Sequence, residues 1–114
     1  MYTFSTNRVR DQIRIVEGAE ELRLRVDVDP MQIMPEINHA KDLLTAVSNA
    51  PENTEALRTA AQAWAGCMFG KEQTEQLAAF YGHNYLSVLN ACTGYFTQRL
   101  SRLLLKAQRK RLRR

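Results

Sequence analysis

The chain has 114 residues, of which 45% are hydrophobic and 25% are charged. This composition is typical of one folded globular domain, here residues 1–114, and argues against disorder of the whole chain. No stretch approaches the roughly 20 apolar residues of a membrane span, and the N-terminus lacks the apolar core and cleavage site of a signal peptide. We therefore expect a cytoplasmic protein without membrane contact.

Charge is distributed unevenly along the chain. Residues 1–75 contain all twelve acidic residues and eight basic ones, whereas residues 76–114 contain eight basic residues and no acidic one. The net charge of +4 therefore combines an acidic body with a basic C-terminal arm, a pattern found in proteins that contact nucleic acid, an acidic protein or a membrane surface. We define the basic patch by its members: Arg99, Arg102, Lys106, Arg109, Lys110, Arg111, Arg113 and Arg114.

The N-terminal part has the period of β-strands. In "LRLRVDV", residues 22–28, apolar and charged side chains alternate, which predicts a strand with one buried and one wet face. Upstream, "QIRIV" repeats the alternation, and Gly18 between the two stretches can supply a positive φ. We predict a β-hairpin over residues 11–28. A lone hairpin is marginal in water, so it must pack on helices or on another chain's strand.

After the hairpin the period becomes helical, over residues 30–109. Asp29 suits an N-cap and Pro30 the first helical position. Pro35 leaves two alternatives open, since it either lies in the first turns of this helix or marks its true start. The segment "SNAPEN" then separates the first helix from the second.

Two glycines and an asparagine divide the remainder. Gly70 is predicted to end the second helix, and Gly82 to end a short third one. A long last helix is predicted from about Asn84 to about Arg109, followed by a basic tail at 110–114. The fold class is thus α+β, mainly α-helical, with an N-terminal hairpin and about four helices.

The sequence contains no catalytic or metal-binding signature. There is no Gly-rich phosphate loop, no paired Cys-x-x-Cys and no His-x-x-x-His. His39 and His83 lie far apart, and Cys67 and Cys92 occupy apolar segments where a thiol is normally inert. We expect two free cysteines, no catalytic residue, no metal, no cofactor and no enzyme activity.

One hypothesis for the C-terminal half is DNA binding. Residues 74–93 have the skeleton of a helix-turn-helix, with Ala78 early, Gly82 at the turn and Val88 in the second helix. However, the second helix carries no arginine or lysine before Arg99, whereas base readout relies on side chains such as Arg, Lys, Asn and Gln. We expect the basic end to be a solvated helix terminus that binds nucleic acid weakly and without sequence specificity.

The other hypothesis is protein–protein interaction. The long helix is apolar on two sides, which a chain of this size is not expected to cover alone. We therefore expect a homo-oligomer or another protein partner. The predicted partner-binding residues lie on one stripe: Leu86, Leu89, Phe96, Leu100 and Leu103.

The stretch "FGKEQTEQLAAFYGHNYLSVLNACTGYFTQRLSRLLLKAQRK", residues 69–110, supports the second hypothesis. It resembles the C-terminal part of small tail assembly chaperones from long-tailed phages and prophages of Gram-positive bacteria. A strand pair followed by helices also looks like that family, whereas the arginine-rich end departs from it. The resemblance implies an oligomeric protein of the host cytoplasm that binds the tape measure protein and helps to recruit tail tube subunits.

Overall fold

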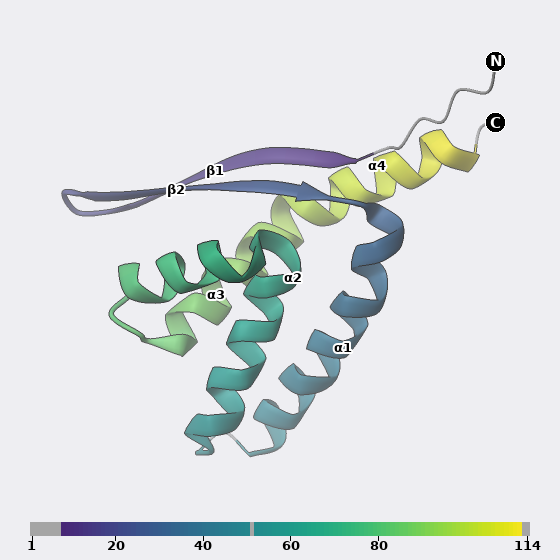
Figure 1. Ribbon diagram of the computed structural model, residues 1–114. Coiled ribbons are helices and arrows are strands. Elements are labelled where there is room, and N and C mark those ends of the chain that lie inside the picture. Colours follow the sequence, from purple (N-terminus) through teal and green to yellow (C-terminus); the bar gives the residue numbers. More distant parts are fainter. Residues whose placement is uncertain (1–7, 51, 113–114) are drawn as a thin grey trace.

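The computed structural model describes residues 8–50 and 52–112, with side chains described as far as residue 107 (Figure 1). Strand β1, Val9–Glu17, and strand β2, Glu20–Val28, pair antiparallel in one uninterrupted register. Gly18 has φ 59° and is the first of the two loop residues, which is the arrangement of a type II′ turn. The predicted hairpin is confirmed, and β1 begins two residues earlier than expected.

The two faces of the hairpin differ as the alternation predicts. Leu24 and Val26 are buried against the helices, whereas Arg23, Arg25 and Asp27 are exposed on the opposite side. We call the exposed side the outer face. Figure 1 shows the hairpin along one side of the helices, with its turn projecting beyond them.

Helix α1, Pro30–Asn49, begins where Asp29 caps it. The Asp29 carboxylate accepts a hydrogen bond from the backbone N–H of Met31 at 2.9 Å, and Pro30 occupies the first helical position. Of the two alternatives for Pro35, the structure has the first: Pro35 lies inside the helix, in its second turn.

Helix α2, Thr54–Phe80, is capped by Asn53 and is kinked at Gly70, where φ is 81° and ψ is 168°. The sequence predicted that one helix ends at Gly70 and a separate short one follows. The chain instead resumes helical geometry directly after the kink, so the two parts run together as one bent helix. Among the described residues there are three continuous helices instead of about four.

The last helix is continuous from Tyr85 to Leu112, and Asn84 caps it with a 3.3 Å bond from the backbone N–H of Ser87. It consists of α3, Tyr85–Tyr95, a π-helical turn η1, Phe96–Leu100, and α4, Ser101–Leu112. The predicted long helix is confirmed. It extends three residues past the expected end, so that only 113–114 of the predicted tail lie outside the described residues.

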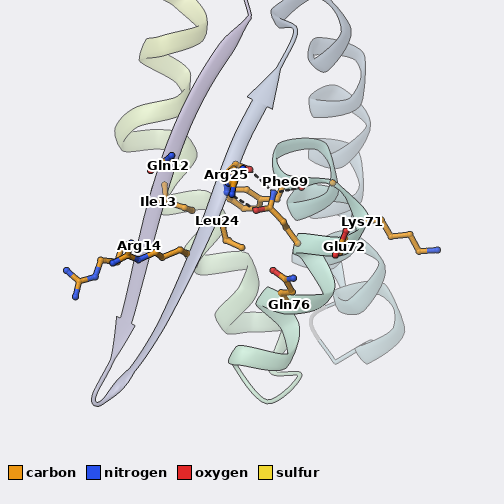
Figure 2. A pocket seen from close by; sticks show the side chains of 12 residues that line it. Gln12, Ile13, Arg14, Leu24, Arg25, Phe69, Lys71, Glu72 and Gln76 are labelled. Carbon is orange, nitrogen blue, oxygen red and sulfur yellow. Dashed lines mark hydrogen bonds between the residues drawn. The ribbon is translucent and has the colours of Figure 1, made fainter.

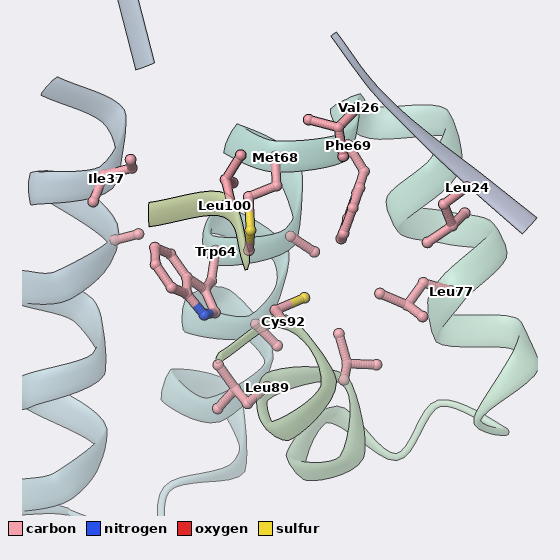
Figure 3. Packing of buried hydrophobic residues seen from close by; sticks show 14 of the residues in the cluster. Leu24, Val26, Ile37, Trp64, Met68, Phe69, Leu77, Leu89, Cys92 and Leu100 are labelled. Atoms are coloured by element: carbon pink, nitrogen blue, oxygen red, sulfur yellow. The ribbon is translucent and has the colours of Figure 1, made fainter. Parts of the chain in front are cut away.

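A single apolar cluster joins the hairpin and the helices. Trp64 of α2 packs on Phe96 with 4.9 Å between ring centroids, and its indole N–H donates to the Thr93 hydroxyl at 3.2 Å. Figure 3 shows Trp64 between Ile37 of α1 and Cys92 of α3. The core thus depends on α2, which contacts α1, α3 and β2.

We predict opposite effects of alanine at two glycines of α2. The Gly70 backbone lies in a region that is essentially restricted to glycine, so Gly70→Ala should lower the free energy of unfolding by about 1–3 kcal/mol. Gly66 is helical and has open space where a Cβ would be, so Gly66→Ala should raise it by about 0.5–1 kcal/mol. Urea denaturation measures both, and equal effects would contradict the assigned kink.

Candidate functional site: the last helix and the hairpin

The structure distributes the five predicted partner-binding residues over different environments. Leu89 and Leu100 are buried, Leu103 is partly buried, and Phe96 packs on Trp64. Leu86 alone of the five is a largely exposed hydrophobic residue, with 56% of its surface accessible.

The expectation that one chain cannot cover this stripe is therefore wrong for Leu89 and Leu100. The chain itself supplies the missing cover, since α2 packs on α3, α1 and β1 contact α4, and both leucines belong to the same buried cluster as Trp64. Partner binding by the last helix stays a prediction, and Leu86 is the residue through which this stripe offers exposed apolar surface.

The basic patch is also divided, because Arg99 is committed to the hairpin. Its guanidinium donates to both carboxylate oxygens of Asp11, at 2.5 and 2.9 Å, and the Tyr95 hydroxyl donates to the same carboxylate at 2.8 Å. The Asp11 side chain is only 8% exposed. Arg99 therefore ties η1 to β1 and is not a free cation, because a nearly buried carboxylate needs a partner.

The protonation equilibria of this cluster follow from its geometry. Burial raises the pKa of Asp11, but the hydrogen bonds from Arg99 and Tyr95 outweigh it and hold that pKa below its ordinary value. Burial, together with the bond to Asp11, raises the pKa of the Tyr95 hydroxyl. The cluster is thus built to keep Asp11 ionised.

The other members of the basic patch lie beyond this cluster. Arg102 and Lys106 are exposed on α4, as expected for a solvated face. Arg109, Lys110 and Arg111 belong to α4, but their side chains lie outside the described residues, as do Arg113 and Arg114 entirely.

Residues 74–93 do form two helices joined by a turn. The second part of α2 leads through Gly82 and His83, both with φ 62°, into α3. Val88, Leu89 and Cys92 of α3 are buried, and its exposed positions include Leu86 and Asn90 but no cation. The arrangement of a helix-turn-helix is present, but α3 lacks the basic side chains that most often contact guanine.

Reasoning from the sequence missed a second basic surface, the outer face of the hairpin. Two acidic residues, Glu21 and Asp27, lie among five arginines there, and the alternation along both strands was the signal that could have revealed it. The ion pairs on this face are Arg8–Asp27, Arg10–Asp27, Arg14–Glu21 and Arg23–Glu21. Arg25 has no ion pair among the described residues.

A wide groove runs between β2 and the second part of α2 (Figure 2). At one end the side-chain amide of Gln73 bonds to the backbone of Arg25, accepting from its N–H and donating to its carbonyl, both at 2.7 Å. The groove has a volume of about 1150 Å³, and Arg23, Phe69 and Gln76 are among its lining residues. A groove beside an exposed strand edge suits an extended chain segment.

Both cysteines are free, and burial raises the pKa of each thiol to about 12. Within residues 8–50 and 52–112 there is no group of three or more metal-ligating side chains. No helix in the described part of the chain is long and apolar enough to cross a membrane.

Comparison with known proteins gives no match to a family model, to a curated protein or to a solved structure.

We predict that Asp11 contributes to stability above acidic pH. Because its folded pKa is depressed, this contribution is present above the unfolded value of about 3.9 and is lost as pH falls through the lower folded pKa. Asp11→Asn should therefore lower the free energy of unfolding at pH 7 and flatten its decline below about pH 4. The control Asp42→Asn, at an exposed site, should retain the decline; an equal slope in both variants would contradict the role of Asp11.

We also predict slow thiol chemistry. Since burial suppresses the thiolate of Cys67 and Cys92, an aromatic disulfide reagent at pH 7.5 should label the folded chain far more slowly than the chain in denaturant. Mass spectrometry assigns the labelled residue. Labelling of either cysteine at the denatured rate would show a reactive thiol.

Proposed function

We propose that the chain is a non-enzymatic tail assembly chaperone of a long-tailed phage or prophage. In the bacterial cytoplasm it would form homo-oligomers, bind the tape measure protein and help to recruit tail tube subunits. The proposal rests on the resemblance of residues 69–110 and on the order of the elements, with a strand pair before the helices.

The observation that carries the proposal is the structural role of the residues in that resemblance. Phe69 and Gly70 form the kink of α2, Gln73 holds β2, and Leu77 is fully buried. The pattern therefore consists of residues that join the hairpin to the helices. Residues with such roles are expected to recur among proteins that share a fold, which is why the pattern supports a common architecture.

The surfaces of the structure also suit a protein that binds other proteins. The hairpin has exposed strand edges and an arginine-rich outer face, and exposed hydrophobic residues lie on the hairpin, α1 and the last helix: Val16, Met31, Leu86 and Leu105. Exposed edges and apolar side chains are the features that strand addition and helix docking use.

Co-expression tests the proposal. The chain should co-purify with a tape measure protein and a tail tube protein when the three are expressed together, and should keep the tape measure protein soluble. Leu86→Asp should weaken this complex by about tenfold, since it places a charge in an apolar contact. Gln98→Asp, which introduces the same charge at an exposed polar position of the last helix, is the matched control and should leave the complex intact. Light scattering on the purified chain gives the oligomeric state.

The DNA-binding hypothesis predicts a different result. In that case no tail protein would co-purify, and one duplex sequence would bind tightly at physiological salt. That binding would be lost on changing Asn84 and Asn90 to alanine. Such an outcome would replace the chaperone proposal by a helix-turn-helix protein that uses residues 74–93 and the basic C-terminus.

A further inference from the structure

The protein itself shows how the edge of β2 that points away from β1 can be paired. Gln73 presents a carboxamide, chemically equivalent to a peptide group, to the backbone N–H and carbonyl of Arg25. Both bonds are 2.7 Å long, within the range of good hydrogen bonds. A side chain from α2 therefore does what the next strand of a sheet would do.

The same bonds show which further residues of β2 direct their N–H and carbonyl groups away from β1. In an antiparallel pair, residues alternate between bonding the partner strand and pointing away from it, and the register shows no bulge. The N–H and carbonyl groups of Glu21, Arg23 and Asp27 therefore point away from β1, as those of Arg25 do. The Asp27 carbonyl accepts from the Arg8 guanidinium at 3.1 Å, so the second half of the edge is capped at two residues.

The first half of the edge has no such cap among the described residues. The N–H and carbonyl groups of Glu21 and Arg23 point away from β1 and have no hydrogen-bond partner in the described part of the chain, and Arg23 lines the groove. Gln76 lies one helical turn beyond Gln73 and lines the groove, and its side chain likewise has no bond to a described residue. Peptide groups and a second carboxamide are thus available side by side, with room between them.

The charges at this half of the edge specify the chemistry of an occupant. Arg14 and Arg23 lie directly opposite each other across the strands, a pairing that is unfavourable between like charges, and they share Glu21. An acidic side chain on an added strand would lie beside Arg23 and close to Arg25 on the outer face. Its neighbours on the other side of that strand would lie near Leu22, which is partly exposed.

We propose that the open half of the β2 edge, at Glu21 and Arg23, takes an extended segment of a partner protein with alternating acidic and apolar residues, held additionally by Gln76. A nucleic-acid duplex fits less well. It is wider than a strand and has no extended peptide backbone to pair with the open N–H and carbonyl groups of β2. The inference rests on the proposed protein-binding role and names the chemistry of one partner segment.

The test uses the full chain and a fluorescent ten-residue peptide of alternating Glu and Val, with a Lys–Val peptide for comparison. Fluorescence anisotropy should show binding of the acidic peptide alone. Arg23→Pro removes one of the two open N–H groups on this edge and leaves the ladder to β1 intact, because that N–H points away from β1. It should weaken binding by at least about tenfold.

Arg14→Pro is the matched control, since Arg14 lies opposite Arg23 and points its own N–H out of the β1 edge. It removes the same charge and should change the affinity less than about threefold. Gln76→Ala lies on α2, does not disturb the strands and should weaken binding about threefold. It therefore tests the inference even if circular dichroism shows that a proline variant is unfolded.

Three outcomes would overturn the inference: no binding of the acidic peptide, equal loss in both proline variants with no effect of Gln76→Ala, or preferential binding of a 20-base-pair duplex that Arg23→Pro leaves unchanged. The co-expression experiment distinguishes this failure from that of the proposed function. A chain that assembles with tail proteins but ignores the peptide keeps its function and loses this site, whereas the reverse result keeps the site alone.

Discussion

The kink at Gly70 is the constraint on which the rest of the fold depends. Before it, α2 packs along α1 and places Trp64 in the centre of the core; after it, the same helix turns towards β2. The Thr74 hydroxyl donates to the Gly70 carbonyl at 2.7 Å, so a side chain one turn after the kink bonds the backbone of the kink itself. A straight α2 could not contact α1 and hold the β2 edge at the same time.

Polar contacts at two places then fix the hairpin on the helices. Gln73 holds β2, and Arg99 with Tyr95 holds Asp11 of β1. Neither contact covers the backbone of the hairpin as a third strand would, because Gln73 bonds the N–H and carbonyl of one residue and Arg99 and Tyr95 bond a side chain. The hairpin is therefore fixed in place but not completed as a sheet, which is the physical basis for proposing that other chains pair with it.

Local patterns predicted most of the fold, while the candidate site was predicted poorly. The alternation of residues 22–28 placed the hairpin, and Asp29 and Asn84 marked helix starts because a cap acts within a few residues. The functional reading of the last helix assumed that its apolar stripe had no cover in the chain. That assumption failed because the stripe's partners come from α2 and the hairpin, far away in sequence.

By itself, the sequence determined the hairpin with its buried face, the helix starts and the order of the elements, since each depends on interactions between residues a few positions apart. Only the tertiary structure decided which leucines of the last helix are buried, that Arg99 binds Asp11, and that half of the β2 edge has no partner among the described residues. Those features depend on contacts across 48 and 88 residues of chain. No local period encodes such contacts, because they arise only when the kinked α2 brings the hairpin and the last helix together.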